Sequence, residues 1–191
     1  MPPKIRYSKA EILHAAFKLT REKGAEAVNA RSIAKELGCS TQPIFRAFQN
    51  MDNIHAEIRS MSMELYNIYM MRSGTQAKTA YMEAGLAYVT FAREEPEIFR
   101  LLFMCDRSGN GAAEAVHQLT PDFIIDIVMN RTGLDRETAR RFHSQIWIYM
   151  HGLATMITTR YIDVSQEQIE SMMEEIYQAM GKLYGITEPK D

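Results

Sequence analysis

Apolar residues recur three or four positions apart along nearly the whole chain of 191 residues, a spacing typical of amphipathic helices. Cap and breaker residues then predict where helices begin and end. Besides two short helices within residues 29–48, we expect helices over about 8–24, 51–71, 81–95, 98–104 and 120–130, and two more after Asp135 and Ser165. No stretch alternates apolar and polar residues for long enough to indicate a strand. The pattern therefore predicts an all-α fold with about nine helices.

Residues 29–48 carry the most specific pattern, two short helices joined by a tight turn. Asn29 is a favourable N-cap for the first helix, and Gly38 suits a turn that needs a positive φ. We expect Ser40 to cap the second helix. Its inward side chains should be Ile44, Phe45 and Phe48, and its outward ones Thr41, Gln42 and Arg46. These features predict a helix-turn-helix, which places its second helix in the major groove of DNA.

The charges of the chain are distributed unevenly. Residues 1–50 contain nine Lys and Arg against four Asp and Glu, a net charge of +5, whereas the remaining residues carry −7. Lys and Arg supply most of the non-specific affinity of a protein for DNA phosphates. We therefore expect residues 1–50 to be a DNA-binding domain and residues 51–191 to be a second helical domain. A random fluctuation in charge is the alternative explanation of this asymmetry.

The sequence argues against several other classes of protein. The N-terminus has no apolar segment typical of a secretion signal, and the densest apolar run, 146–157, is too short to cross a bilayer. Two cysteines, Cys39 and Cys105, suit a reducing cytoplasm, and we place Cys105 within a helix. No nucleophile–histidine pattern, phosphate-binding glycine loop or zinc-spaced cluster is present. We expect a cytoplasmic protein with no membrane partner, catalytic activity, metal or cofactor.

The last two predicted helices have more apolar surface than one chain needs to cover. The helix that contains residues 145–157 is apolar on nearly every side, so one side needs a partner. Pairing of both helices with their symmetry mates would give a four-helix bundle in a homodimer. The expected interface residues are Leu153, Ile157, Ile169, Met173, Ile176 and Met180. The alternative is a deeply buried core within a monomer.

Residues 8–54 resemble the N-terminal DNA-binding domain of the tetracycline-repressor (TetR/AcrR) family of transcriptional regulators. The matching segments are 28–34, Leu37-Gly38, Ser40 and 44–48. The resemblance implies that DNA contacts come from Asn29, Arg31, Thr41, Gln42, Pro43, Phe45, Arg46 and Met51. Gln42 is the expected base reader, since glutamine can pair with adenine through two hydrogen bonds. The family usually has tyrosine at position 45 and lysine at position 51, so Phe45 and Met51 each lack a phosphate contact.

The second part of the chain resembles a subset of that family named for a Trp-His-Gly motif, here Trp147 with His151-Gly152. The resemblance implies a small-molecule pocket, and twelve of the fourteen methionines lie from Met61 onward. The expected lining is Tyr81, Tyr88, Phe91, Phe103, Met104, Phe123, Trp147 and His151. Such a lining suits an apolar or aromatic effector that would release a repressor from a palindromic operator. The alternative is a body that docks a protein partner and binds no inducer.

Overall fold

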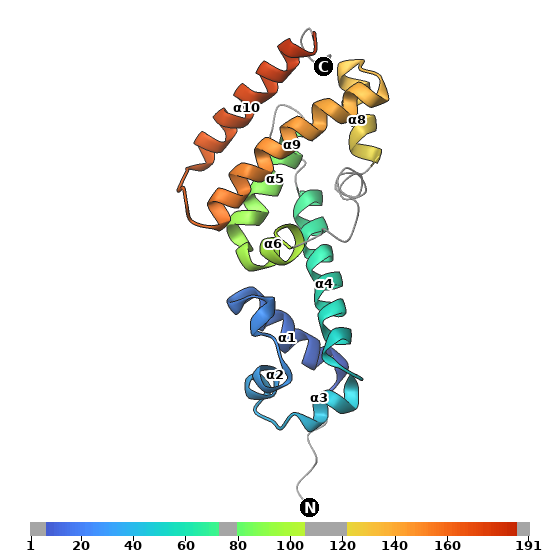
Figure 1. The fold of residues 1–191 in the computed structure, drawn as a ribbon, viewed down its shortest axis with the longest axis vertical. Coiled ribbons are helices and arrows are strands. Elements are labelled where there is room, and N and C mark those ends of the chain that lie inside the picture. Colours follow the sequence, from blue (N-terminus) through green and yellow to red (C-terminus); the bar gives the residue numbers. More distant parts are fainter. Residues whose placement is uncertain (1–6, 73–79, 106–121, 187–191) are drawn as a thin grey trace, which may run out of the picture. The chain divides into compact units, whose positions relative to one another are not determined.

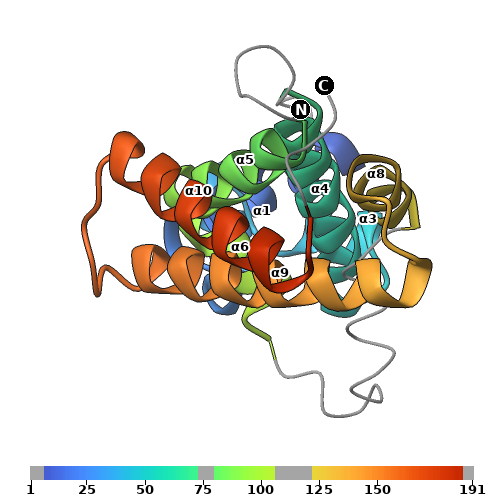
Figure 2. The ribbon, with the colours of Figure 1, turned by 90° about the horizontal axis from the view of Figure 1, so that it is seen from above.

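The computed structural model describes residues 7–72, 80–105 and 122–186, and Figure 1 and Figure 2 show them from two directions. This part of the chain forms nine α-helices, one short 3₁₀ helix and no strand, which confirms the predicted all-α fold. The helices are α1 (Lys9–Lys23), η1 (Ala25–Ala27), α2 (Ala30–Leu37), α3 (Gln42–Ala47), α4 (Met51–Arg72), α5 (Ala80–Glu94), α6 (Pro96–Phe103), α8 (Asp122–Thr132), α9 (Arg136–Thr158) and α10 (Gln166–Leu183).

Side-chain caps begin several of these helices where the sequence predicts them. At α1, the Ser8 Oγ accepts from the Glu11 backbone N–H at 3.2 Å, and the Glu11 carboxylate accepts from the Ser8 N–H at 2.8 Å. Asp135 caps α9, and Ser165 caps α10 with a second capping box. Because these signals are local in the sequence, they predict helix ends well. The expected start at Thr120-Pro121 lies outside the described residues.

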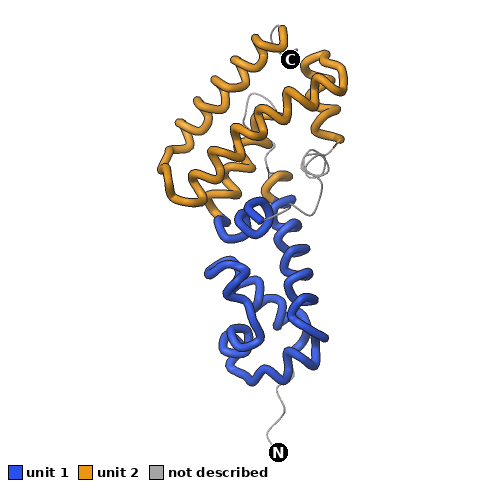
Figure 3. Tube along the Cα trace, viewed as in Figure 1, with its two compact units in different colours: residues 1–68, 95–105 blue, residues 69–94, 106–191 orange. Residues whose placement is uncertain are grey.

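The chain divides into two compact units (Figure 3). Unit 1 comprises Met1–Ile68 and Glu95–Cys105, and unit 2 comprises Tyr69–Glu94 and Asp106–Asp191. Helix α6 therefore packs with α1 in unit 1, although about seventy residues separate the two helices in the sequence. The predicted domain boundary at residue 50 stays a prediction.

The core of unit 1 gathers apolar side chains from α1, α2, α3 and α4. The apolar residues spaced three or four positions apart on α1 are buried: Ile12, Ala15, Ala16 and Leu19 are at most 4% exposed. Ile33, Ile44, Ile54 and Ile58 complete this core from the other three helices, with no exposed surface at all. On α4 the apolar spacing continues beyond this core, because Ile68 is 46% exposed. Burial of this kind supplies the main stabilisation of a small helical unit.

Unit 2 is organised around α9, against which α5, α8 and α10 pack (Figure 1). The inner side of α9 is buried and consists of Ala139, Phe142, Ile146, Met150, Leu153, Ala154 and Thr158. Gly85 of α5 permits close packing, because a Cβ there would lie only 2.4 Å from the Cε of Met173. In the described part of the chain, no helix combines the length and the apolarity that crossing a bilayer requires.

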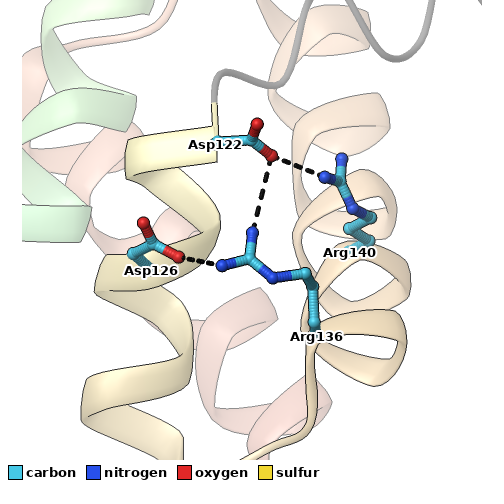
Figure 4. Close-up of polar contacts among 4 residues, drawn as sticks. All are labelled: Asp122, Asp126, Arg136 and Arg140. Carbon is cyan, nitrogen blue, oxygen red and sulfur yellow. Dashed lines mark hydrogen bonds and ion pairs between the residues drawn. The ribbon is translucent and has the colours of Figure 1, made fainter.

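Ion pairs join the start of α8 to the first turns of α9 (Figure 4). Arg136 contacts Asp126 at 2.5 Å and Asp122 at 3.5 Å, and Arg140 contacts Asp122 at 2.6 Å. All four side chains are 30% or more exposed, so each pair contributes at most about 1 kcal/mol. The pairs fix the orientation of the α8–α9 hairpin more than they stabilise it.

Candidate nucleic-acid interface

The first helix of the predicted helix-turn-helix begins at a reciprocal cap. The Oδ1 of Asn29 accepts from the backbone N–H groups of Arg31 and Ser32, both at 3.0 Å. In return, the Asn29 N–H donates to the Oγ of Ser32 at 2.9 Å. The side-chain oxygen of Asn29 is thus engaged in fixing the start of α2. Arg31, in the first turn after this cap, is exposed.

The turn between α2 and α3 depends on a glycine. Gly38 has φ 67° and ψ 34°, in the left-handed region, and a Cβ at this position would meet nothing within 4 Å. Glycine is therefore required at position 38 because of the left-handed backbone conformation, and not because a side chain would lack space. The N–H of Cys39 donates to the Ala34 carbonyl at 2.9 Å, and the Tyr7 hydroxyl donates to the Leu37 carbonyl at 2.5 Å. These bonds satisfy carbonyls at the end of α2 and hold the turn.

Helix α3 is only six residues long, and two predictions about it are wrong. Ser40 does not cap the helix: Thr41 occupies the N-cap position, with no side-chain cap hydrogen bond. Phe45 does not face inward, because its side chain is 52% exposed. Ile44 and Phe48, one turn apart, are both buried and define the inner side. Phe45 lies about 100° round the helix from Ile44, which turns its side chain away from the inner side.

The outward side of α3 combines three kinds of side chain. Gln42, Phe45 and Arg46 are exposed, whereas Thr41 and Pro43 are half-buried. An amide, an aromatic ring and a guanidinium therefore project from one short helix. Met51 differs from them, because its half-buried side chain packs against the core of unit 1 and offers less surface to DNA. The DNA contacts of the eight residues stay a prediction.

Ion pairs connect α1 to its neighbours in unit 1. Lys18 contacts Glu36 of α2 at 2.6 Å, and the bond raises the pKa of Lys18 and lowers the pKa of Glu36. Arg21 makes a two-pronged contact with Glu95: its Nε donates to Oε2 at 2.8 Å, and its Nη2 donates to Oε1. The Glu95 side chain is only 6% exposed. A buried carboxylate requires such a partner, so this pair ties α6 to α1.

In unit 2, hydrogen-bonded tyrosine–histidine pairs join α5 to α9. The Tyr88 hydroxyl lies 2.8 Å from the Nδ1 of His151, whose ring stacks on Trp147 with centroids 4.8 Å apart. Trp147 lies one turn before His151 on α9, and His143 lies one turn before Trp147. The Nδ1 of His143 is 2.9 Å from the Tyr81 hydroxyl. Three of the expected pocket residues, Tyr88, Trp147 and His151, thus form one cluster.

Burial keeps these histidines neutral at pH 7. It lowers the pKa of His143 from 6.5 to about 4, and it lowers the pKa of His151 as well. Burial also raises the pKa of the Tyr81 hydroxyl, which therefore stays protonated. A hydroxyl that donates to Nδ1 places the ring proton of the neutral histidine on Nε2. Both pairs are then uncharged and satisfied.

The other expected pocket residues have different surroundings within their own units. Phe91 is buried against Tyr69, with ring centroids 5.2 Å apart, and Phe123 is 61% exposed near the start of α8. Phe103 and Met104 belong to unit 1. Cys105 follows α6 in a bend and not, as predicted, within a helix. The sequence therefore indicated individual aromatic residues but not which of them contact one another.

Sequence reasoning also missed several residues that organise the two units. His143 shares the four-residue spacing of Trp147 and His151 on α9, and this spacing was a usable signal. Phe142 and Tyr177 pack edge to face at 5.8 Å beside Tyr81, which no local pattern indicates. The Arg21–Glu95 pair joins residues 74 positions apart, so a single sequence contains no signal for it.

The helix-turn-helix of α2 and α3, with Gln42, Phe45 and Arg46 exposed on its outward side, defines the class: a helix-turn-helix DNA-binding regulator. Residues 12–58 match the sequence model of the bacterial regulatory proteins of the tetR family. Residues 81–180 match that of the tetracyclin repressor-like C-terminal domain, which alone spans more than half of the chain. The chain belongs to the TetR family, whose members are transcriptional regulators and not enzymes. The predicted membership in the Trp-His-Gly subset is not confirmed.

Solved structures share the fold of this chain. A TetR-like transcriptional regulator from Rhodococcus sp. RHA1 superposes with a TM-score of 0.67 at 11% identity, over 97% of this chain and 99% of that one. A transcriptional regulator from Rhodococcus sp. Rha1 gives a TM-score of 0.61 at 14% identity, over 92% and 97%. At these identities the likeness concerns the fold alone. No curated protein gives a significant sequence match.

Proposed function

We propose that the protein is a dimeric, sequence-specific repressor that acts in the cytoplasm and that a small apolar or aromatic molecule releases from its operator. The observation that carries the DNA-binding part is the outward side of α3, where Gln42, Phe45 and Arg46 are exposed beside a rigidly capped α2. Arg31 at the start of α2 would contact a phosphate or a base edge. Gln42 would read adenine in the major groove.

This proposal predicts distinct effects for the two residues. Arg31→Ala should weaken operator binding by about 1–3 kcal/mol, and Gln42→Ala should relax specificity at one base position. Fluorescence anisotropy across a salt series measures both effects. Arg141→Ala, which removes an exposed arginine of α9, is the matched control and should leave operator affinity unchanged. Equal affinity of the wild type for operator and random DNA would contradict the proposal.

The dimer proposal needs a revised set of interface residues. Leu153, Ile169 and Met173 are at most 2% exposed, because their own chain already covers them. Ile157, Ile176 and Met180 are half-buried and retain surface for a partner. The outer side of α9 offers more apolar surface at two positions eight residues apart, with Ile148 63% exposed and Met156 38% exposed.

Gly152 lies midway between Ile148 and Met156 and supports the dimer most directly. A Cβ at this position would meet nothing within 4 Å, so packing within the chain does not require glycine here. Glycine inside a helix costs about 1 kcal/mol relative to alanine. We infer that a second copy of α9 crosses at Gly152, where the missing side chain allows the two backbones to approach.

A bulky residue introduced at position 152 tests whether the chain forms this dimer. Gly152→Leu has open space within the chain, so each protomer of the variant should still fold, which circular dichroism verifies. Sedimentation at micromolar concentration should nevertheless give a monomer, with operator affinity lost. Ser60→Leu, an exposed position on α4, is the control and should stay dimeric. A monomeric wild type would favour instead a partner protein on the apolar outer side of α9.

The effector part of the proposal is supported by the cluster of Tyr88, Trp147 and His151. Its rings offer stacking surfaces, and its polar groups are few and neutral, which suits an aromatic ligand. Trp147 is the single tryptophan of the chain, so its fluorescence reports on this cluster alone. A panel of aromatic and amphipathic compounds can be titrated with and without operator. Compounds that alter the fluorescence but leave operator affinity unchanged would contradict induction, since an effector must favour one state.

A further inference from the structure

Phe45 is an exposed aromatic residue on the outward side of α3. Its side chain is 52% exposed, and it is the one exposed aromatic residue in the described part of unit 1. Ile44 and Phe48 fill the inner side of α3, so the backbone directs the ring outward whatever its contacts. A single exposed apolar side chain is ordinary in itself. Its surroundings therefore decide what it does.

The surroundings of Phe45 are the polar groups expected to meet DNA. Gln42 precedes it by three residues and Arg46 follows it directly, and both are exposed. Residues three or four positions apart neighbour each other on a helix surface, so Gln42 neighbours Phe45 three positions later and Arg46 four positions later. The amide therefore links the ring and the guanidinium along one exposed side of α3. Lys and Arg outnumber Asp and Glu by five in residues 1–50, which suits a polyanionic partner. The ring consequently faces whatever duplex Gln42 and Arg46 approach.

We propose that Phe45 is a specificity-determining residue that packs against the 5-methyl group of a thymine in the major groove. A phenyl ring has no hydrogen-bonding group, so it gains nothing from a phosphate oxygen or from the donors and acceptors of base edges. The thymine methyl is the apolar group that the major groove displays, and cytosine lacks it. Each operator half-site therefore contains a thymine under α3 that cytosine cannot replace. The inference rests on the proposed function, because it presupposes an operator.

The experiment removes the methyl group and the ring in turn. Wild-type protein first selects its operator from random duplexes, and each thymine of a half-site is then replaced singly by deoxyuridine, which lacks only the methyl. Anisotropy titrations compare the wild type with Phe45→Ala. At one thymine the wild type should bind the deoxyuridine operator about fourfold more weakly, the value of one buried methyl. For Phe45→Ala this ratio should fall to one, with the ratios at other thymines unchanged.

Controls separate the possible failures. Met63→Ala removes another exposed apolar side chain, 41% exposed on α4, and should keep the wild-type ratio. Phe45→Leu retains an apolar group and should therefore keep part of the discrimination between thymine and deoxyuridine. Circular dichroism verifies that each variant is folded. The thymine contact would be overturned, with operator binding intact, if Phe45→Ala kept the fourfold ratio between the affinities for the thymine and deoxyuridine operators. It would also be overturned if the wild type bound every deoxyuridine operator as tightly as the thymine operator. A selection that returns no preferred sequence would overturn the proposed function and this inference together.

Discussion

Acid should destabilise this protein through His143, and the size of the effect follows from its environment. Burial lowers the pKa of His143 in the folded chain to about 4, whereas the unfolded chain has the ordinary value of 6.5. Between these values the unfolded state binds a proton that the folded state does not. The free energy of unfolding therefore falls as the pH falls from 6.5 towards 4, and the contribution is fully present above 6.5.

The difference in pKa corresponds to about 3 kcal/mol in total, of which about 2 kcal/mol is lost by pH 5. His143→Gln removes the titrating ring but keeps a side-chain oxygen that can accept from the Tyr81 hydroxyl. At pH 7 the variant should lose about 1 kcal/mol through imperfect packing. At pH 5 it should be as stable as the wild type or more stable.

Urea unfolding at pH 7, 6 and 5 measures this difference directly. His14→Gln, at an exposed position of α1, is the control and should retain the full acid sensitivity of the wild type. Because carboxylates titrate in both proteins, only the difference between each variant and the wild type is compared. A constant difference between His143→Gln and the wild type from pH 7 to pH 5 would refute the reasoning.

Two further predictions concern unit 1. Arg21→Met leaves the buried Glu95 carboxylate without its bidentate partner and should destabilise the fold by about 1–3 kcal/mol. The loss is smaller than for a fully buried pair, because Arg21 is half exposed. Thermal unfolding measures the loss, and adding Glu95→Gln to the same chain should recover part of it. Gly38→Ala forces a side chain into the left-handed region at φ 67° and should cost about 1–2 kcal/mol in the same assay, although no neighbour obstructs it; an unchanged melting temperature would contradict this account of the turn.

The helices and their caps could be predicted because their signals are local. Ser8 with Glu11 and Ser165 with Gln168 lie three residues apart, and each box depends on nothing distant. The orientation of Phe45 could not be predicted in this way, since Ile44, Phe45 and Phe48 are all apolar and only the packing of α3 on its neighbours shows which of them is exposed. The sequence shows which residues are apolar, but only the packing of the helices shows which of them are buried.

Contacts between distant segments account for what the sequence did not reveal. Helix α6 packs with α1 in unit 1, where Glu95 meets Arg21, and neither residue carries a pattern that points to the other. The apolar residues of α9 indicated a partner surface, but the buried Leu153 and the exposed Ile148 look equally suitable in the sequence. Candidate residues of the DNA-reading helix were easier to name, because a short helix after a tight turn has few outward positions.

Specific operator binding through the outward side of α3 is the central claim, and one competition experiment tests it most directly. Labelled operator, selected from random duplexes by the wild type, is displaced at physiological salt by unlabelled operator or by a scrambled duplex of equal composition. The wild type should prefer the operator by about a thousandfold or more. The variant with both Gln42→Ala and Arg46→Ala should lose most of this preference while retaining its fold. Equal displacement by the two duplexes, or a preference that survives in the variant, would contradict the account.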